Sequence, residues 1–291
     1  MKELLKGCID LHLHAGPSTA AREVDTAEMM RAALEYGYRA YVVKDHMFPT
    51  VMSARLIEAH MGQDRVRAFG GIVLNNSVGG INLKAAATAC EMGAKFVCMP
   101  TASAANHLAY YTKGFPGGAE SEVPERPMRV ADDDGDLLPE VCNVIEYISR
   151  HPQVVLMTGH GTVEEVDAVV REAHRLGVRS IHVNHPYHIV GASIDKMAEW
   201  AELGAYIELN ACLIVPESKI HSVDLDLVQR MLVRLPMERL VLCSDLGQKG
   251  NLHPADGLLR LMEVMMKDAG LTEAQVRMMT CETPAKILGI D

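Results

Sequence analysis

Residues 91–99, EMGAKFVCM, join the end of a predicted helix to a short apolar strand through Gly93. The same order of features recurs in RLGVRSIHV at residues 175–183 and in ELGAYIELN at residues 202–210. Glycine commonly ends a helix in the left-handed conformation, and a short apolar run between turn signals is typical of a buried strand. The chain is therefore predicted to repeat a unit of one strand and one helix.

Eight such strands can be marked along the chain, at residues 9–14, 40–44, 68–74, 95–100, 154–158, 180–184, 205–210 and 240–244. Parallel strands need helical crossovers, and a closed barrel leaves no free edge, so we predict an α/β fold, a (β/α)8 TIM barrel that could be distorted. An open, doubly wound sheet is the rival. Polar residues follow nearly every strand, and only a barrel gathers all these ends on one face.

The length of 291 residues suits one barrel domain over residues 1–291. A connection without strong periodicity, residues 101–137, is predicted as an insertion after the fourth strand, either a lid or a surface elaboration. The net charge of -10 argues against a nucleic-acid partner, and no apolar run is long enough to span a membrane. We expect a soluble, cytoplasmic protein with a small-molecule substrate and a possible homo-oligomeric state.

IDLHLH, residues 9–14, carries the first candidate site residues. Strand periodicity places His12 and His14 on one side together with Asp10, and the apolar residues on the other. Two imidazoles at one strand end suit a divalent metal such as zinc, although His-x-His pairs also arise by chance. Independent support comes from three later strand ends, which carry His160, His185 and Asp245.

These motifs resemble the amidohydrolase superfamily of metal-dependent barrel hydrolases, over most of the chain. The resemblance implies that His12, His14 and Asp245 bind one or two divalent ions, zinc in the first place, with manganese or iron as alternatives. It implies that His160 and His185 are ligands or catalytic helpers. It also implies that Asp245, in SDLGQ, takes the proton of the attacking water.

Two departures from that family concern the second and fourth strands. The fourth strand, KFVCMPT, lacks the lysine or glutamate that often bridges two metals in this superfamily. The second strand ends in VVKDH, which resembles the Thr-Asp-His strand end of the polymerase and histidinol phosphatase family and makes His46 a predicted ligand. Lys44 could be carboxylated and bridge two metals, supply positive charge for catalysis, or pair with Asp45. The chain could belong to an amidohydrolase-like branch that combines both features.

Three more histidines lie in loops after strands four, six and eight, and are predicted to contact substrate: His107, His188 and His253. The remaining histidines are interpreted as structural, His182 among them. The predicted function is metal-dependent hydrolysis of an amide, lactone or other ester, with Asp245 as base and His185 or His160 stabilising the oxyanion. A phosphoesterase, a barrel that binds without catalysis, and a decarboxylase stay open as alternatives.

Overall fold

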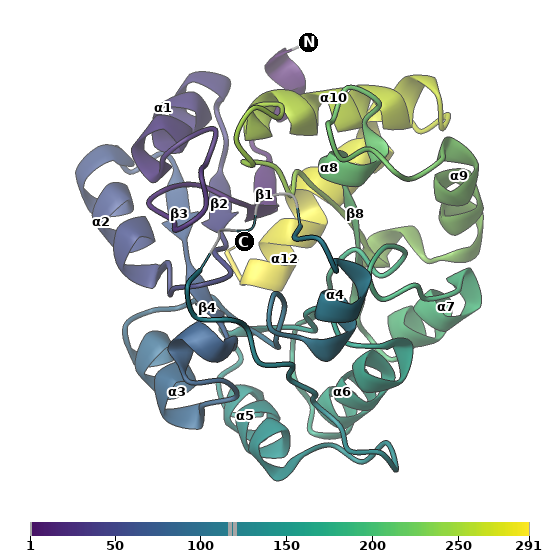
Figure 1. The fold of residues 1–291 in the computed structure, drawn as a ribbon. Helices are drawn as coiled ribbons and strands as arrows, with labels where there is room; N and C mark the ends of the chain where they lie inside the picture. Colours follow the sequence, from purple (N-terminus) through teal and green to yellow (C-terminus); the bar gives the residue numbers. More distant parts are fainter. Residues whose placement is uncertain (1, 116–117, 119–120, 291) are drawn as a thin grey trace.

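Parallel strands form a barrel at the centre of the molecule (Figure 1). The structure is a computed structural model that describes residues 2–115, 118 and 121–290. Every strand pairing is parallel, in the orders β1-β2-β3 and β4-β5-β6-β7-β8-β9. The strands are β1 (Ile9–Leu13), β2 (Ala40–Val43), β3 (Arg67–Phe69), β4 (Gly71–Val73), β5 (Phe96–Cys98), β6 (Val155–Met157), β7 (Ile181–Val183), β8 (Tyr206–Asn210) and β9 (Leu240–Cys243).

Helices surround the strands and alternate with them, which confirms the predicted (β/α)8 architecture (Figure 1). Their ends carry the expected signals: Asp25 and Glu28 form a capping box on α1, and Gly37 ends that helix with φ 72°. The helices are α1 (Thr26–Tyr36), α2 (Val51–Met61), α3 (Leu83–Glu91), α4 (Ala105–Tyr110), α5 (Pro139–Ser149), α6 (Val163–Arg175), α7 (Ile194–Glu202), α8 (Ala211–Ile214), α9 (Leu225–Arg234), α10 (Pro254–Lys267), α11 (Glu273–Arg277) and α12 (Thr283–Leu288). Among the described residues, no helix has the length and hydropathy needed to cross a membrane.

The third predicted strand is divided into β3 and β4 at Gly70. A side chain at Gly70 would collide with the backbone of Thr50, whose N–H donates to the Gly71 carbonyl over 2.9 Å. The segment that enters α2 therefore presses against the strand and breaks its ladder. Paired glycines inside a strand are a recognised sign of such a close approach.

The first strand joins the last, and this contact sets up the site. The Asp245 N–H donates to the His12 carbonyl at 2.7 Å, and the His14 N–H donates to the Leu246 carbonyl at 2.8 Å. The register of β1 on β2 shifts between Asp10 and Leu13. Strict alternation along IDLHLH was therefore wrong: Leu11 packs in the barrel interior and Leu13 packs against the helices.

The amino-terminal end of the barrel is closed by α12, which lies across it (Figure 1). Ala285, Ile287 and Leu288 pack on the inner side chains of the strands, and Ser180, at the start of β7, donates to the Ile287 carbonyl. The inner cluster includes Phe96 and Tyr206 and lies below the polar carboxyl-terminal ends. The opposite end of the barrel is thus left for the loops that follow the strands.

Candidate metal centre

Five imidazoles surround the carboxyl-terminal end of the barrel axis. Neighbouring ring centroids lie 4.9 to 6.0 Å apart, in the cyclic order His12, His14, His46, His160 and His185. All five side chains are buried. Each comes from the end of a different strand except the first two, which share β1. The structure therefore brings together the histidines that the sequence analysis chose as metal ligands.

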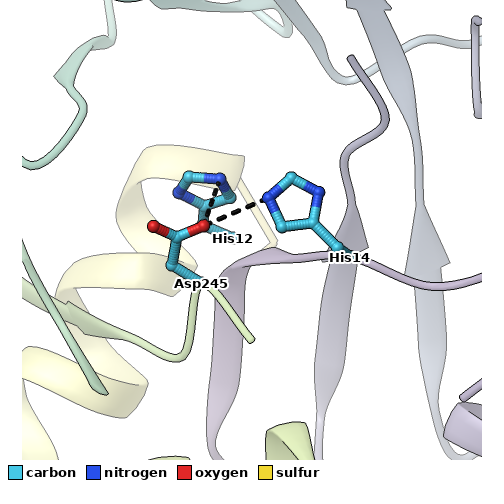
Figure 2. A group of neighbouring side chains, drawn as sticks. All are labelled: His12, His14 and Asp245. Atoms are coloured by element: carbon cyan, nitrogen blue, oxygen red, sulfur yellow. Dashed lines mark hydrogen bonds and ion pairs between the residues drawn. The ribbon is translucent and has the colours of Figure 1, made fainter. Parts of the chain in front are cut away.

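Asp245 faces the first pair of imidazoles (Figure 2). One carboxylate oxygen lies 3.2 Å from His12 Nε2 and 3.1 Å from His14 Nε2, and the second oxygen lies 3.9 Å from His185 Nε2. The ligand atoms of His12, His14 and Asp245 all lie within 4.8 Å of one another. Two imidazole nitrogens and a carboxylate oxygen in this arrangement are the ligand types that zinc and related divalent ions take.

In His12 and His14 the second ring nitrogen, Nδ1, contacts an acceptor on the side away from Asp245. His12 Nδ1 lies 3.0 Å from both carboxylate oxygens of Glu208, and His14 Nδ1 lies 2.8 Å from the Lys44 carbonyl oxygen. Both partners are acceptors, so each Nδ1 is placed to donate a proton to them. With Nδ1 as the donor, each Nε2 would offer its lone pair to a metal ion bound beside Asp245.

Burial disfavours the charged form of four of these imidazoles. It lowers the pKa of His14 and of His185 to about 4, and holds the pKa values of His46 and His160 well below the ordinary value of 6.5. Burial alone would raise the pKa of Asp245, but His12 and a hydrogen bond from His14 lower it to about 2. At neutral pH these four imidazoles are therefore neutral and the Asp245 carboxylate is ionised.

The backbone is strained where two of these side chains leave their strands. His185 has φ 24° and Asp245 has φ 50°, values that residues other than glycine rarely adopt. Such strain gathers at functional sites, where surrounding contacts impose it. Gly247 adds a further constraint, because any side chain there would collide with the His14 carbonyl.

Glu208 is a fully buried carboxylate that the sequence analysis did not select. Besides His12 it lies 3.0 Å from His182 Nε2 and accepts hydrogen bonds from Asn184 and Asn210. Asn210 also donates to the second oxygen of Asp245 at 3.0 Å. Glu208 thus fixes the orientation of His12 and is linked through one amide to Asp245. The signal was present in ELGAYIELN, where an acid stands inside an otherwise apolar strand.

His46 is anchored by the neighbouring strand ends. Its Nδ1 lies 2.8 Å from the Thr101 hydroxyl, and Asn75 donates both to that hydroxyl and to the His46 carbonyl. The amide oxygen of Asn75 in turn accepts from the Thr101 N–H. Polar residues predicted at strand ends therefore orient this imidazole, and Nε2 is the His46 nitrogen available to bind a metal or a substrate.

Lys44 lies inside the barrel end, with 0% of its surface exposed, and its Nζ has no hydrogen-bond partner among the described residues. Of the three roles considered for Lys44, pairing with Asp45 is wrong, because Asp45 is paired instead with Arg22, whose Nη2 lies 3.3 Å away. Arg22 belongs to the loop after β1 and was not foreseen. After burial, which is the main cause, its positive charge also contributes to the lowered pKa values of His14 and His46.

Of the three histidines predicted to contact substrate, two line a cavity beside the cluster and the third does not. His107, on α4, stacks on His160 with its Nδ1 2.9 Å from the Nδ1 of that ring, and His188 Nε2 lies 2.8 Å from the Tyr111 hydroxyl. Both line a cavity of about 50 Å3 above the imidazoles and Asp245. His253 does not: it caps α10, accepting the Ala255 N–H through Nδ1. Its position before Pro254 is a helix-start signal that outweighed the loop argument.

A divalent ion fits this set of residues. Two buried ring nitrogens of the cluster, His12 Nε2 and His160 Nε2, have no hydrogen-bond partner among the described residues. Buried polar atoms without partners are costly, and a metal would satisfy the ring nitrogens. A second group, His185, Glu208 and Asp245, also has ligand atoms within 4.8 Å of one another. The first group could hold one ion, and the second group could supply ligands to a second ion.

Fold and site together define the class: a (β/α)8 barrel whose strand ends carry a histidine and aspartate cluster able to bind a divalent metal. The chain belongs to a family of unknown function (DUF6282), whose model matches residues 7–208. A comparison with curated proteins found no match.

Several solved barrel hydrolases are similar to the whole chain. An organophosphorus hydrolase variant from Deinococcus radiodurans is 15% identical, with a TM-score of 0.58, over 99% of this chain and 94% of that one. A phosphotriesterase homology protein from Escherichia coli, in complex with phosphate, is 13% identical, with a TM-score of 0.54, over 98% and 99%. A TatD homologue from Escherichia coli is 14% identical, with a TM-score of 0.56, over 100% of both chains. Structural neighbours of this kind bear out the resemblance to the amidohydrolase superfamily at the level of the fold.

Proposed function

We propose that this chain is a metal-dependent hydrolase that cleaves an amide, lactone or other ester bond of a small molecule. The observation that carries the proposal is the convergence of His12, His14 and Asp245, with ligand atoms within 4.8 Å of one another and with each Nδ1 facing an acceptor. The similar barrel hydrolases support the same class of reaction. Zinc is the proposed ion because imidazole and carboxylate ligands suit it.

The residues around the ion have distinct roles in this proposal. A bound divalent ion would lower the pKa of a coordinated water from about 15.7 towards about 7 and polarise the scissile carbonyl. Asp245 is ionised at neutral pH, so it can take the proton of the attacking water and return it to the leaving group. His185 and His160 line the same cavity and would stabilise the developing oxyanion, either directly or as further ligands.

A panel of metal-loaded assays tests this function. Amide, lactone, carboxylic ester and phosphoester substrates are offered to the zinc-loaded protein, to Asp245→Asn and to Asp195→Asn, which changes an aspartate on the exposed side of α7. We expect turnover on at least one carbonyl substrate, lost in Asp245→Asn and kept in Asp195→Asn. Full activity in Asp245→Asn would contradict the assigned base, and stoichiometric zinc without turnover would favour a barrel that only binds.

Phosphoester hydrolysis is the second candidate, and the buried cations favour it. Lys44 Nζ has no partner among the described residues, and Arg22 pairs with Asp45, the residue next to Lys44, so two buried cations lie at the end of β2 and could attract an anionic phosphoryl group. The phosphotriesterase homology protein from Escherichia coli was solved with phosphate in its active site. In the same panel, a phosphoester preference that Lys44→Met abolishes would support this candidate over carbonyl hydrolysis.

A further inference from the structure

The space above the metal cluster is too small for a substrate. Its cavity measures about 50 Å3, which admits only a few water molecules. Typical small-molecule sites measure about 300 to 1,000 Å3. The body of any substrate must therefore lie in a space that adjoins this cavity.

A second cavity, of about 860 Å3, adjoins it. His107, Tyr111 and Phe115 line both spaces and form their common wall. The Phe115 ring stands edge-on to two imidazoles, with its centroid 4.6 Å from that of His107 and 5.3 Å from that of His46. Phe115 is therefore the side chain whose rotation would join the two spaces.

The larger cavity has mainly apolar walls. Its carbon-rich lining comes from Met47, Leu108, Phe115, Val123 and Pro124. Val123 leaves 76% of its surface exposed, so no part of the described chain covers it. Glu125, one of the two charged residues in the lining, is already bound by Asn76 and Ser103. An apolar occupant would cover the exposed carbon atoms of this lining.

We propose that the 860 Å3 cavity binds the apolar body of the substrate while the scissile group crosses the wall at Phe115 to reach the cluster. This inference rests on the proposed function and narrows its substrates to esters, lactones or amides with a sizeable apolar substituent. Leu108 is the residue on α4 that would contact that substituent.

Alkyl hydroxamic acids provide a direct test, because the head group binds zinc and the tail can be lengthened. Full burial of the four methylenes that separate hexanohydroxamic from acetohydroxamic acid, at about 0.8 kcal/mol each, corresponds to a factor of about 200 in Kd. We expect calorimetry on the zinc-loaded protein to give at least a tenfold gain. Leu108→Trp should reduce the gain below threefold, and Val233→Trp, on the exposed face of α9, should keep it.

A dye that needs no metal separates this inference from the proposed function. N-phenyl-1-naphthylamine should fluoresce with the metal-free wild type and with Val233→Trp, and much less with Leu108→Trp. If the protein shows metal-dependent turnover but Leu108→Trp changes neither the gain in hydroxamate affinity with chain length nor the dye fluorescence, the cavity assignment is overturned. The proposed hydrolase function would then be unaffected. Dye binding that Leu108→Trp removes, in a chain that binds no zinc, would support the apolar cavity and refute the hydrolase.

Discussion

Replacing Glu208 with glutamine should weaken metal binding without altering any ligand. The carboxylate accepts from His12 Nδ1 over 3.0 Å and from the buried side chains of Asn184 and Asn210, and it lies 3.0 Å from His182 Nε2. An amide of the same shape removes the charge and turns one acceptor into a donor, which cannot satisfy donors on both sides. His12 is then free to rotate or to change tautomer, so its Nε2 no longer points reliably at Asp245.

The size of this effect follows from the contacts that are lost. Hydrogen bonds to charged groups contribute about 1.5 to 3 kcal/mol, and loss of an outer partner of a metal ligand typically costs 10- to 100-fold in affinity. We therefore expect the zinc Kd of Glu208→Gln to rise about 10- to 100-fold. Competition with a chromophoric chelator measures this Kd. Glu146→Gln removes a carboxylate from an exposed ion pair and serves as the matched control.

A structural collapse has to be distinguished from lost orientation. Urea unfolding of the metal-free proteins should show Glu208→Gln still folded, destabilised by about 1 to 3 kcal/mol because buried donors lose their acceptor. A zinc Kd equal to that of the wild type, in a folded Glu208→Gln, would refute the idea that Glu208 orients His12.

Three further outcomes are expected. Asp245→Asn should abolish turnover and shift the urea midpoint only slightly, as steady-state assays and unfolding curves would reveal; retained activity would contradict its role. Lys44→Met should leave the metal-free chain as stable or more stable, because it removes a buried amine without a partner, and a loss of several kcal/mol would show that this amine is satisfied. Metal-free protein should lose stability as pH falls from 6.5 to 4, because His14, His107 and His185 have folded pKa values of about 4 and the unfolded chain binds more protons in that window. Burial raises the pKa of Asp10 to about 6, which acts in the opposite direction, but Asp10 is one group against three. A urea midpoint that does not change over this pH range would contradict this account.

Most of the metal cluster could be predicted from the sequence because parallel strands end on one face of a barrel. An apolar run followed by a histidine or aspartate therefore fixes a side chain in space, as for His160 and Asp245. The same logic correctly joined residues as far apart in the sequence as His14 and Asp245, which are 231 positions apart and whose atoms lie 3.1 Å apart.

What the sequence analysis missed depends on contacts between segments. Arg22 lies in an irregular loop, and nothing local indicates that it pairs with Asp45. The register shift in β1 arises in its pairing with β2, and the break at Gly70 arises where Thr50 approaches. His253 was misplaced because loop membership does not reveal that a ring nitrogen is already used as a helix cap.

The central claim is that His12 and His14 hold a divalent ion, and zinc content tests it most directly. Three proteins are dialysed against limiting zinc and analysed by elemental mass spectrometry: the wild type, His12→Ala/His14→Ala and the control His151→Ala/His174→Ala. The two rings removed in the control form hydrogen bonds with backbone carbonyls away from the cluster. We predict at least one zinc per chain in the wild type and the control, and only traces in His12→Ala/His14→Ala. Equal zinc in all three proteins, or none in the wild type, would contradict the account.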